Sequence, residues 1–421
     1  MDTDVRPIDV RSGPVEALVR PPGSKSITNR ALVLASLARP AASRLSGALE
    51  ADDTVVMRSG LRDLGVLIDD VDDPWLVLGT GGQLTAPARP IDAGASGTTA
   101  RFLTAIATLA DGPVTVDGSH RMRERPIGEL TDALAALGAD VNTAGGFPPV
   151  VIEGSGIHGG AVTVDGRRSS QFVSALLMLA PMLDGPSEIS LVEGELVSRP
   201  YVDGTVRIMR QFGAVVEDRH NGYGVAPSGY EKTHLEIEAD ASAAAYPLVA
   251  AAVTGGVVVV TGIPVDSIQP DLRLIEVLAA MGCVVTRDAN SIRLIGPDRL
   301  EPVDVDMNDA PDAVLALSIA CLFARGPSRI RNIGNLRLKE TDRLEALRTE
   351  LNRVGAAASI ESDDLVIRPG GLRPARIATY DDHRMAMSFA VAGLRIPGIE
   401  IADPGCVAKT WPGYFDMLDA L

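Results

Sequence analysis

Short apolar segments led by glycine or proline recur along the chain at intervals of about 70 residues. Their runs of valine and isoleucine between turn-forming residues predict β-strands. The clear examples are residues 112–116, 185–189, 256–260, 326–330 and 397–401, and a weaker one lies at 42–45. The recurrence indicates a chain assembled from similar units.

A second pattern keeps the same interval. Amphipathic helical segments end in a glycine and are followed by a small, apolar strand, as at residues 214–216. The glycines are Gly65, Gly138, Gly213, Gly282 and Gly355, and a last helix is expected within residues 412–421. The two patterns together predict six βα units. Each unit is too short to bury a core alone, so we expect an α/β protein of two compact domains with three units each, and not a solenoid.

Composition narrows the class of protein. A chain of 421 residues with 46% hydrophobic residues exceeds one ordinary core. It has no apolar run of membrane-spanning length, and its acidic N-terminus lacks a hydrophobic signal core, so we expect a cytoplasmic protein. Cys283, Cys321 and Cys406 do not have metal-ligand spacing, which disfavours structural zinc and a disulfide framework.

Charge points to a small anionic ligand. The formal net charge is -16 and the pI is about 4.8, so most of the surface should repel nucleic acid. Cations nevertheless recur beside small hydrogen-bonding residues in segments marked by glycine or proline, as in loops that meet a ligand. These segments are residues 22–30, 94–101, 123–126, 169–171, 198–201, 311–313, 339–343, 382–384 and 408–410.

The segment 339–343 places two cations and two carboxylates close together. If it begins a helix, Lys339 and Arg343 lie on one face with Glu340 beside them, which would combine anion binding with a proton donor. The alternative for this segment is an exposed charge network without function.

Two other segments allow plainer interpretations. Asp52 and Asp53, with the following threonine, are expected to form a helix N-cap, and Ser169 with Ser170 could merely cap a helix. The sequence around Lys25 lacks the glycine spacing of a nucleoside triphosphate loop, so that type of site is disfavoured.

Taken in order and spacing, six of these segments closely resemble the motif series of the 5-enolpyruvylshikimate-3-phosphate synthase family. They are residues 22–30, 123–126, 169–171, 339–343, 382–384 and 408–410, and the resemblance extends over essentially the whole chain. It implies a two-domain inside-out α/β barrel in which each domain has three repeated βαβαββ-type units. Residues 1–18 and 239–421 would form the first lobe, residues 19–238 the second, with the active site in the cleft between them.

The resemblance also implies the activity and the binding residues. The enolpyruvyl group of phosphoenolpyruvate would move to the 5-hydroxyl of shikimate 3-phosphate in the shikimate pathway. Residues implied for shikimate 3-phosphate are Lys25, Ser26, Arg30, Ser169, Ser170, Gln171, Ser198, Tyr201, Asp312, Asn335 and Lys339. Those implied for phosphoenolpyruvate are Lys25, Gly97, Arg125, Gln171, Arg343, Arg384 and Lys409.

Addition followed by elimination needs a base at the hydroxyl and an acid at the enol methylene. Asp312 is the expected partner of the 5-hydroxyl, Glu340 the proton donor and acceptor, and Lys25 the stabiliser of developing charge. His383 is expected to tune Glu340 or a phosphate. We expect no metal and no organic cofactor, and a monomer.

Two rival functions remain open from the sequence. A UDP-N-acetylglucosamine enolpyruvyl transferase would share the architecture but carry a reactive cysteine in its first domain, whereas the first cysteine here is Cys283. A non-catalytic anion-binding module would not need Lys25, Asp312, Glu340 and Lys409 together. The family's inhibitor glyphosate is expected to compete with phosphoenolpyruvate, with sensitivity reduced by Ala95 and Phe102, which depart from the usual loop.

Overall fold

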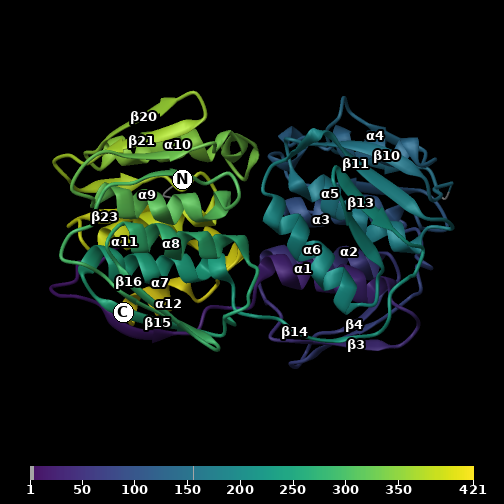
Figure 1. The fold of residues 1–421 in the computed structure, drawn as a ribbon, viewed down its shortest axis with the longest axis horizontal. Helices are drawn as coiled ribbons and strands as arrows, with labels where there is room; N and C mark the ends of the chain where they lie inside the picture. Colours follow the sequence, from purple (N-terminus) through teal and green to yellow (C-terminus); the bar gives the residue numbers. More distant parts are fainter. Residues whose placement is uncertain (1–3, 155) are drawn as a thin grey trace. The chain divides into compact units, whose positions relative to one another are not determined.

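The chain divides into two compact α/β units (Figure 1), in a computed structural model that describes residues 4–154 and 156–421. Unit 1 comprises Met1–Pro22 and Glu238–Leu421, and unit 2 comprises Gly23–Ile237. The predicted lobe boundaries lay at residues 18/19 and 238/239. The strand that ends at Val19 and the residues up to Pro22 thus belong to unit 1.

One repeat shows the building rule. β6 (Ile91–Asp92) is followed by α3 (Gly97–Ala107), β7 (Val114–Asp117), α4 (Gly128–Ala136), β8 (Val141–Thr143) and β9 (Val150–Ile152). β6 and β7 are parallel, while β9 pairs antiparallel with both β7 and β8. This is a βαβαββ unit, as predicted, and the same pairing recurs in the four other four-stranded sheets of the described residues.

The remaining elements of unit 2 build two further sheets. One sheet has the order β14-β3-β5-β4 and the other β10-β11-β13-β12. Their strands are β3 (Ala42–Ser46), β4 (Leu67–Asp69), β5 (Trp75–Leu78), β10 (Ala161–Gly166), β11 (Ser187–Leu196), β12 (Val216–Arg219), β13 (Gly222–Val225) and β14 (His234–Glu236). The helices are α1 (Lys25–Leu37), α2 (Asp52–Asp63), α5 (Ser170–Leu179) and α6 (Arg199–Gln211).

Unit 1 repeats the plan with two four-stranded sheets and one three-stranded sheet, β1-β23-β22. Its strands are β1 (Val5–Pro7), β2 (Glu16–Val19), β15 (Val257–Thr261), β16 (Val284–Asp288), β17 (Ser291–Ile295), β18 (Asp304–Asp306), β19 (Ser328–Arg331), β20 (Ala357–Glu361), β21 (Asp364–Arg368), β22 (Ala375–Ile377) and β23 (Ile399–Ala402). Its helices are α7 (Ala241–Thr254), α8 (Arg273–Ala280), α9 (Val314–Leu322), α10 (Arg343–Arg353), α11 (His383–Gly393) and α12 (Tyr414–Asp419).

Distant strands complete a repeat in each unit. In unit 1, β2 pairs parallel with β15, and in unit 2, β14 pairs parallel with β3. The two strands of each pair are far apart in sequence, and the whole of unit 2 is inserted into unit 1 between Pro22 and Glu238. The continuous repeat of the sequence is therefore interrupted in space.

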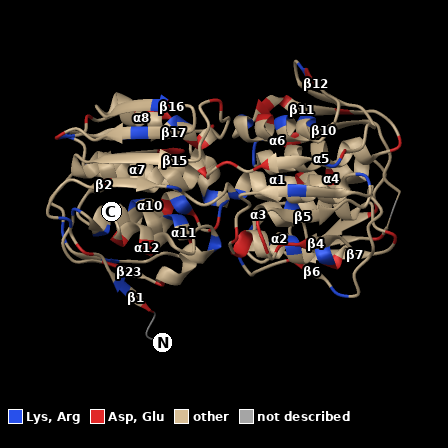
Figure 2. Cartoon of the chain, turned by 90° about the horizontal axis from the view of Figure 1, so that it is seen from below, with Lys and Arg blue, Asp and Glu red and all other residues tan. Residues whose placement is uncertain are grey.

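The core of each unit is made of helices, and the sheets lie outside them. In unit 1, α7, α9 and α11 pack against one another, and all of their residues are buried. Helices α7 and α9 carry no charged residue, and α7 is drawn in tan, the colour of the other residues, in Figure 2. Figure 1 shows α9, α11 and α7 between the strands β21 and β15. In unit 2, α3 packs against both α1 and α5. Buried helices surrounded by sheets give the expected inside-out arrangement.

The predicted strands and helix ends are confirmed. The six apolar segments coincide with β7, β11, β15, β19, β23 and β3, and α12 lies within residues 412–421. The five helix-ending glycines have φ between 85° and 102°. This left-handed conformation costs a residue without Cβ little, which explains why glycine follows each of these helices.

Candidate active site

Several predicted site residues lie at the N-terminal ends of helices within each unit. α1 begins at Lys25, α3 at Gly97, α5 at Ser170 and α11 at His383, and Asp312 lies in the short turn just before α9. A helix N-terminus offers free backbone N–H groups and a partial positive charge, both of which favour anions. The repeat thus brings a segment with predicted site residues to the same position in successive βαβαββ repeats.

Arg343, the first residue of α10, is the centre of the unit 1 cluster. Its side chain is 1% exposed and contacts three carboxylates. Nε and Nη2 donate to Asp382 at 2.7 and 3.2 Å, Nη1 donates to Asp312 at 2.9 Å, and Glu340 lies 2.9 Å from Nη2. Burial alone would lower the pKa of Arg343, but attraction to the three carboxylates outweighs it and raises the pKa above its ordinary value.

Asp312 joins Arg343 to a second buried arginine, Arg384. Its other carboxylate oxygen accepts from Arg384 Nη2 at 2.9 Å, and Arg384 Nη1 donates to the Tyr246 hydroxyl at 3.4 Å. Burial would lower the pKa of Arg384, but nearby acidic groups, Asp312 foremost, outweigh it and raise the pKa well above its ordinary value. Burial raises the pKa of Tyr246 to about 12, even though Arg384 acts to lower it. The arginine pair is therefore fixed in its charged form.

The helical geometry predicted for residues 339–343 is wrong. Lys339 follows a short 3-10 turn (Gly334–Leu338), and α10 begins only at Arg343, so the two cations do not share a helix face. The Asp342 carboxylate accepts from the Glu345 N–H at 3.0 Å and caps the helix at that point. The alternative of an exposed charge network is also wrong, because the Glu340 side chain is 11% exposed and Arg343 is buried.

Three more predicted residues of unit 1 are buried to different degrees. His383 is 0% exposed, with Nδ1 3.5 Å from an Asp382 oxygen. Both amide atoms of Asn335 are buried and have no hydrogen-bond partner among the described residues. Lys409 is 8% exposed and lies near Asp381. Burial and Asp403 raise the pKa of Asp381, and Lys409 acts to lower it.

Arg30 is a buried arginine of unit 2, and the hydrogen-bond partners of its side chain are all neutral. Nε donates to the Thr205 hydroxyl at 2.6 Å, and Nη1 donates to the hydroxyl and carbonyl of Ser26 at 2.7 and 3.0 Å. Nη2 lies 3.4 Å from the Ser174 hydroxyl and 3.3 Å from the Tyr201 carbonyl. No carboxylate of the described residues pairs with Arg30, and burial lowers its pKa to about 10. A charge in this position is poorly compensated by the protein itself.

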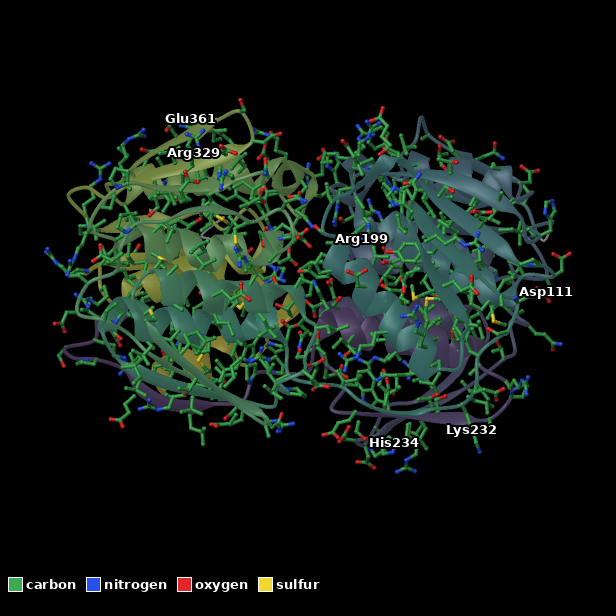
Figure 3. The ribbon with its side chains drawn as sticks, viewed as in Figure 1. Asp111, Arg199, Lys232, His234, Arg329 and Glu361 are labelled. Carbon is green, nitrogen blue, oxygen red and sulfur yellow. The ribbon has the colours of Figure 1, made fainter. Side chains whose placement is uncertain are left out.

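The predicted serine hydroxyl groups lie at the starts of α5 and α6, the helices whose Ser174 and Thr205 contact this arginine. The Ser169 hydroxyl accepts from the Gln171 N–H at 3.2 Å, so this serine does cap α5, and Ser170 is 8% exposed. Ser198 precedes α6, is buried, and has φ of 53°. Tyr201, three residues later, contacts Arg30 through its carbonyl oxygen. Arg199, which follows Ser198 in the sequence, is exposed and is labelled in Figure 3.

Lys25 has a partner that the sequence did not reveal. Its ammonium lies 3.1 Å from the carboxylate of Asp53, which is buried. The expectation that Asp52 and Asp53 cap α2 is wrong, because the N-cap is Ala51, whose N–H donates to the Thr54 hydroxyl at 3.2 Å. Asp53 instead fixes Lys25 from the first turn of that helix.

Gly97 and Arg125 are in close contact. A Cβ atom at residue 97 would lie 2.6 Å from Arg125 Nη2, and Arg125 Nη1 donates to the Ala95 carbonyl at 3.4 Å. The glycine therefore makes room for the guanidinium. Arg101, another buried arginine, donates to the Pro126 carbonyl at 2.7 Å and so holds the segment that carries Arg125.

The residues that prediction missed are positioning groups. Asp382, Asp53 and Arg101 are buried and hold a predicted residue or its segment in place. Asp382 stood within a recognised motif. The pairing of Asp53 with Lys25, 28 positions away, and that of Arg101 with Pro126, 25 positions away, gave no local signal in the sequence.

Two searches of the described residues concern cofactors and membranes. Residues 4–154 and 156–421 contain no group of three or more His, Cys, Asp or Glu side chains that could hold a metal ion. In the same part of the chain, no helix is both long and apolar enough to cross a membrane.

Repeated α/β units with buried arginines, Arg343 and Arg384 at helix N termini and Arg30 within α1, are typical of a protein that binds small, strongly anionic molecules. Comparison with known proteins makes this specific. The family model for EPSP synthase (3-phosphoshikimate 1-carboxyvinyltransferase) matches residues 10–418. The chain belongs to the EPSP synthase family.

Individual relatives agree with this assignment. A 3-phosphoshikimate 1-carboxyvinyltransferase of Rhizobium leguminosarum bv. trifolii is 43% identical over 417 residues, covering 97% of this chain and 95% of the relative. The enzyme of Nostoc punctiforme is 43% identical over 420 residues, covering 98% of both chains. The solved structure of EPSP synthase from Acinetobacter baumannii superposes with a TM-score of 0.81 at 27% identity, covering 98% of this chain and 97% of that one.

Proposed function

We infer that the chain catalyses the reaction of its family, the transfer of the enolpyruvyl group of phosphoenolpyruvate to the 5-hydroxyl of shikimate 3-phosphate with release of phosphate. This is a step of the shikimate pathway, which leads to aromatic amino acids. The observation that carries the proposal is a buried arginine centre in each unit, Arg30 in unit 2 and Arg343 with Arg384 in unit 1. Two polyanionic substrates require such centres.

Unit 2 supplies most of the shikimate 3-phosphate site in this proposal. A buried guanidinium with only neutral partners gains most from a carboxylate, because the ligand provides the missing counter-charge. We assign that role to Arg30. Ser169, Ser170 and Ser198 bind the phosphate at helix starts, and Gln171 and Tyr201 lie beside the ring.

Unit 1 contributes to both substrates. The buried, unsatisfied amide of Asn335 would be satisfied by shikimate 3-phosphate, with Lys339 beside it. Arg343, Arg384 and Lys409, together with Arg125 from unit 2, clamp phosphoenolpyruvate. Arg343 uses four of its five N–H groups on three carboxylates, so phosphoenolpyruvate bound through two N–H groups would displace one of these carboxylates. Displacement would release Asp312 or Glu340 for proton transfer.

The chemistry then proceeds by addition and elimination. Asp312 takes the proton of the 5-hydroxyl while the hydroxyl oxygen attacks C2 of phosphoenolpyruvate. Glu340 gives a proton to the methylene carbon. Loss of phosphate from the tetrahedral intermediate returns a methyl proton to Glu340, and the proton on Asp312 passes to the departing phosphate, which restores both carboxyl groups. Lys25, held by Asp53, stabilises the charge that develops between the substrates, and His383 acts through Asp382 on the arginine pair.

Both substrates must meet for this reaction, so we propose that the active site forms in a cleft between the units and that the substrates close it. We also propose a cytoplasmic monomer. Small-angle scattering tests closure, since the radius of gyration should fall with shikimate 3-phosphate. Size-exclusion chromatography with light scattering tests the monomer.

Glyphosate is the proposed competitor of phosphoenolpyruvate. The absence of a Cβ at Gly97 lets the Arg125 guanidinium lie against the backbone, and the Ala95 carbonyl contacts the same guanidinium. Phe102 is buried, with the Arg30 guanidinium 5.2 Å from its ring, so its influence on this pocket would act through α3. Because proline at this helical position would also remove a backbone donor, Phe102→Leu is the better probe of sensitivity than Phe102→Pro.

Phosphate release from phosphoenolpyruvate tests the activity directly. We expect release only when shikimate 3-phosphate is present, and none when UDP-N-acetylglucosamine replaces it. Release with the nucleotide sugar alone would contradict the proposed acceptor. Binding of both substrates without release would instead support the non-catalytic module.

A further inference from the structure

Besides the Arg343–Asp382 contact, a second hydrogen-bonded contact joins α10 to the segment before α11, and none of the predicted site residues takes part in it. Glu350 lies seven positions after Arg343, two turns along the same helix face, and is 0% exposed. Its carboxylate accepts from the Tyr380 hydroxyl at 2.7 Å and from the Ala378 N–H at 3.4 Å. Arg353 lies 3.0 Å from the same carboxylate, but its side chain is 48% exposed.

Tyr380 stands in a strained turn. Tyr380 and Asp381 have φ of 57° and 54°, and the Asp382 N–H donates to the Thr379 carbonyl at 2.9 Å. Two consecutive positive φ values are the signature of a type I′ turn, which glycine and asparagine normally occupy. A tyrosine here costs conformational free energy, so contacts elsewhere must hold the turn.

The ring of Tyr380 gives little of that support, because the residue is 40% exposed. Its hydroxyl, by contrast, reaches a buried carboxylate over a short hydrogen bond. The next residue but one is Asp382, which accepts from Arg343 Nε and from the Arg384 backbone N–H at 2.7 and 2.9 Å. The strained turn is thus tied to α10 on both sides.

We propose that Glu350 and Tyr380 are positioning residues for the phosphoenolpyruvate half of the reaction. Their hydrogen bond holds the turn in the conformation that presents Asp382 to Arg343. Without it the turn relaxes, Asp382 shifts, and both arginines lose their fixed orientation. This inference rests on the proposed function, in which Arg343 and Arg384 bind phosphoenolpyruvate while Arg30 in unit 2 binds the other substrate.

Tyr380→Phe is the sharpest test because it removes one hydroxyl from a half-exposed ring. We expect the KM for phosphoenolpyruvate to rise by about fivefold, while the KM for shikimate 3-phosphate stays within about twofold. Glu350→Gln keeps an acceptor oxygen for Tyr380 and should have a smaller effect than Glu350→Ala. Amide exchange of residues 378–382 should be faster in Tyr380→Phe than in the wild-type protein.

Tyr230→Phe is the matched control. The Tyr230 hydroxyl donates to the Met178 carbonyl at 2.8 Å inside unit 2, so its loss should lower thermal stability without changing the ratio of the two KM values. An unchanged ratio in Tyr380→Phe would overturn the proposal, as would slow exchange of the turn. A wild-type chain that releases no phosphate would count against the proposed function. The exchange measurement would still decide whether the Glu350–Tyr380 hydrogen bond holds the turn.

Discussion

The carboxylate of Asp53 lies 3.1 Å from the ammonium group of Lys25, and the Asp53 side chain is 4% exposed while that of Lys25 is 14% exposed. The pair joins the first turns of α1 and α2. A lysine has four rotatable stem bonds and seldom holds one position unaided. Asp53 therefore fixes the position of the Lys25 ammonium group.

We expect Asp53→Asn to lower turnover by about tenfold, because Lys25 loses its charged partner and its fixed position. The neighbouring Asp52 is exposed in the same helix turn, so Asp52→Asn is the matched control and should be close to wild type. Steady-state kinetics of both variants, with thermal melting to separate stability from function, check this. Equal kinetics in the two variants would show that the pair has no functional role.

Glu340 and Asp312 should respond differently to neutral replacement. Glu340→Gln keeps the size of the side chain but loses the titrating proton, so we expect turnover to fall by about 100-fold with little change in shikimate 3-phosphate affinity. Asp312 is also the shared partner of Arg343 and Arg384, at 2.9 Å from each. Asp312→Asn should therefore alter the KM for phosphoenolpyruvate as well.

Single-turnover measurements separate these effects from product release. Near-normal turnover in Glu340→Gln would remove Glu340 from the mechanism. A pure loss of turnover in Asp312→Asn, with both KM values unchanged, would show that the arginine pair does not need its bridging carboxylate.

Gly97→Ala should weaken phosphoenolpyruvate and glyphosate together. The added methyl carbon would lie 2.6 Å from Arg125 Nη2, so the guanidinium must move. We expect the KM for phosphoenolpyruvate and the glyphosate inhibition constant each to rise by about tenfold or more, with shikimate 3-phosphate affinity unchanged. Inhibition kinetics against phosphoenolpyruvate measure both constants, and glyphosate that remains as potent as on wild type would refute the shared contact.

The fold should lose stability in alkaline solution. Burial raises the pKa of Tyr246 to about 12, and raises those of Tyr230 and Tyr414 well above 10.0. Groups with a raised folded pKa contribute fully below the unfolded value near 10, and the contribution is lost as the pH rises through the folded value. For Tyr246 the loss amounts to at most about 3 kcal/mol. Arg30, whose pKa burial lowers to about 10, acts in the opposite sense but is a single group.

Equilibrium unfolding in urea between pH 9 and 11 checks this expectation. We expect the free energy of unfolding to fall over that range, and the fall to be smaller in Tyr230→Phe, which lacks one of the titrating groups. A free energy that stays constant or rises across the range would contradict the assignment of these tyrosines.

The sequence by itself determined the repeating architecture. Glycines with positive φ after the helices and apolar strands at a fixed interval are local requirements of backbone geometry and burial, so they are visible in any short window of the chain. The same holds for the motifs that supplied Lys25, Arg343 and Arg384, because each motif is continuous in sequence. These features were predicted with their residue positions.

Only the tertiary structure decided how those side chains are paired. Arg30 meets Thr205 across 175 positions, Arg343 meets Asp382 across 39, and neither partner carries a local signal that names the other. The cap at Asp342 also separated Lys339 from α10, although the charge pattern alone suggested one helix face. Residues far apart in sequence become hydrogen-bond partners only when folding brings them close together. A pattern along the sequence therefore identifies the reactive groups but not the neighbours that fix their charge and position.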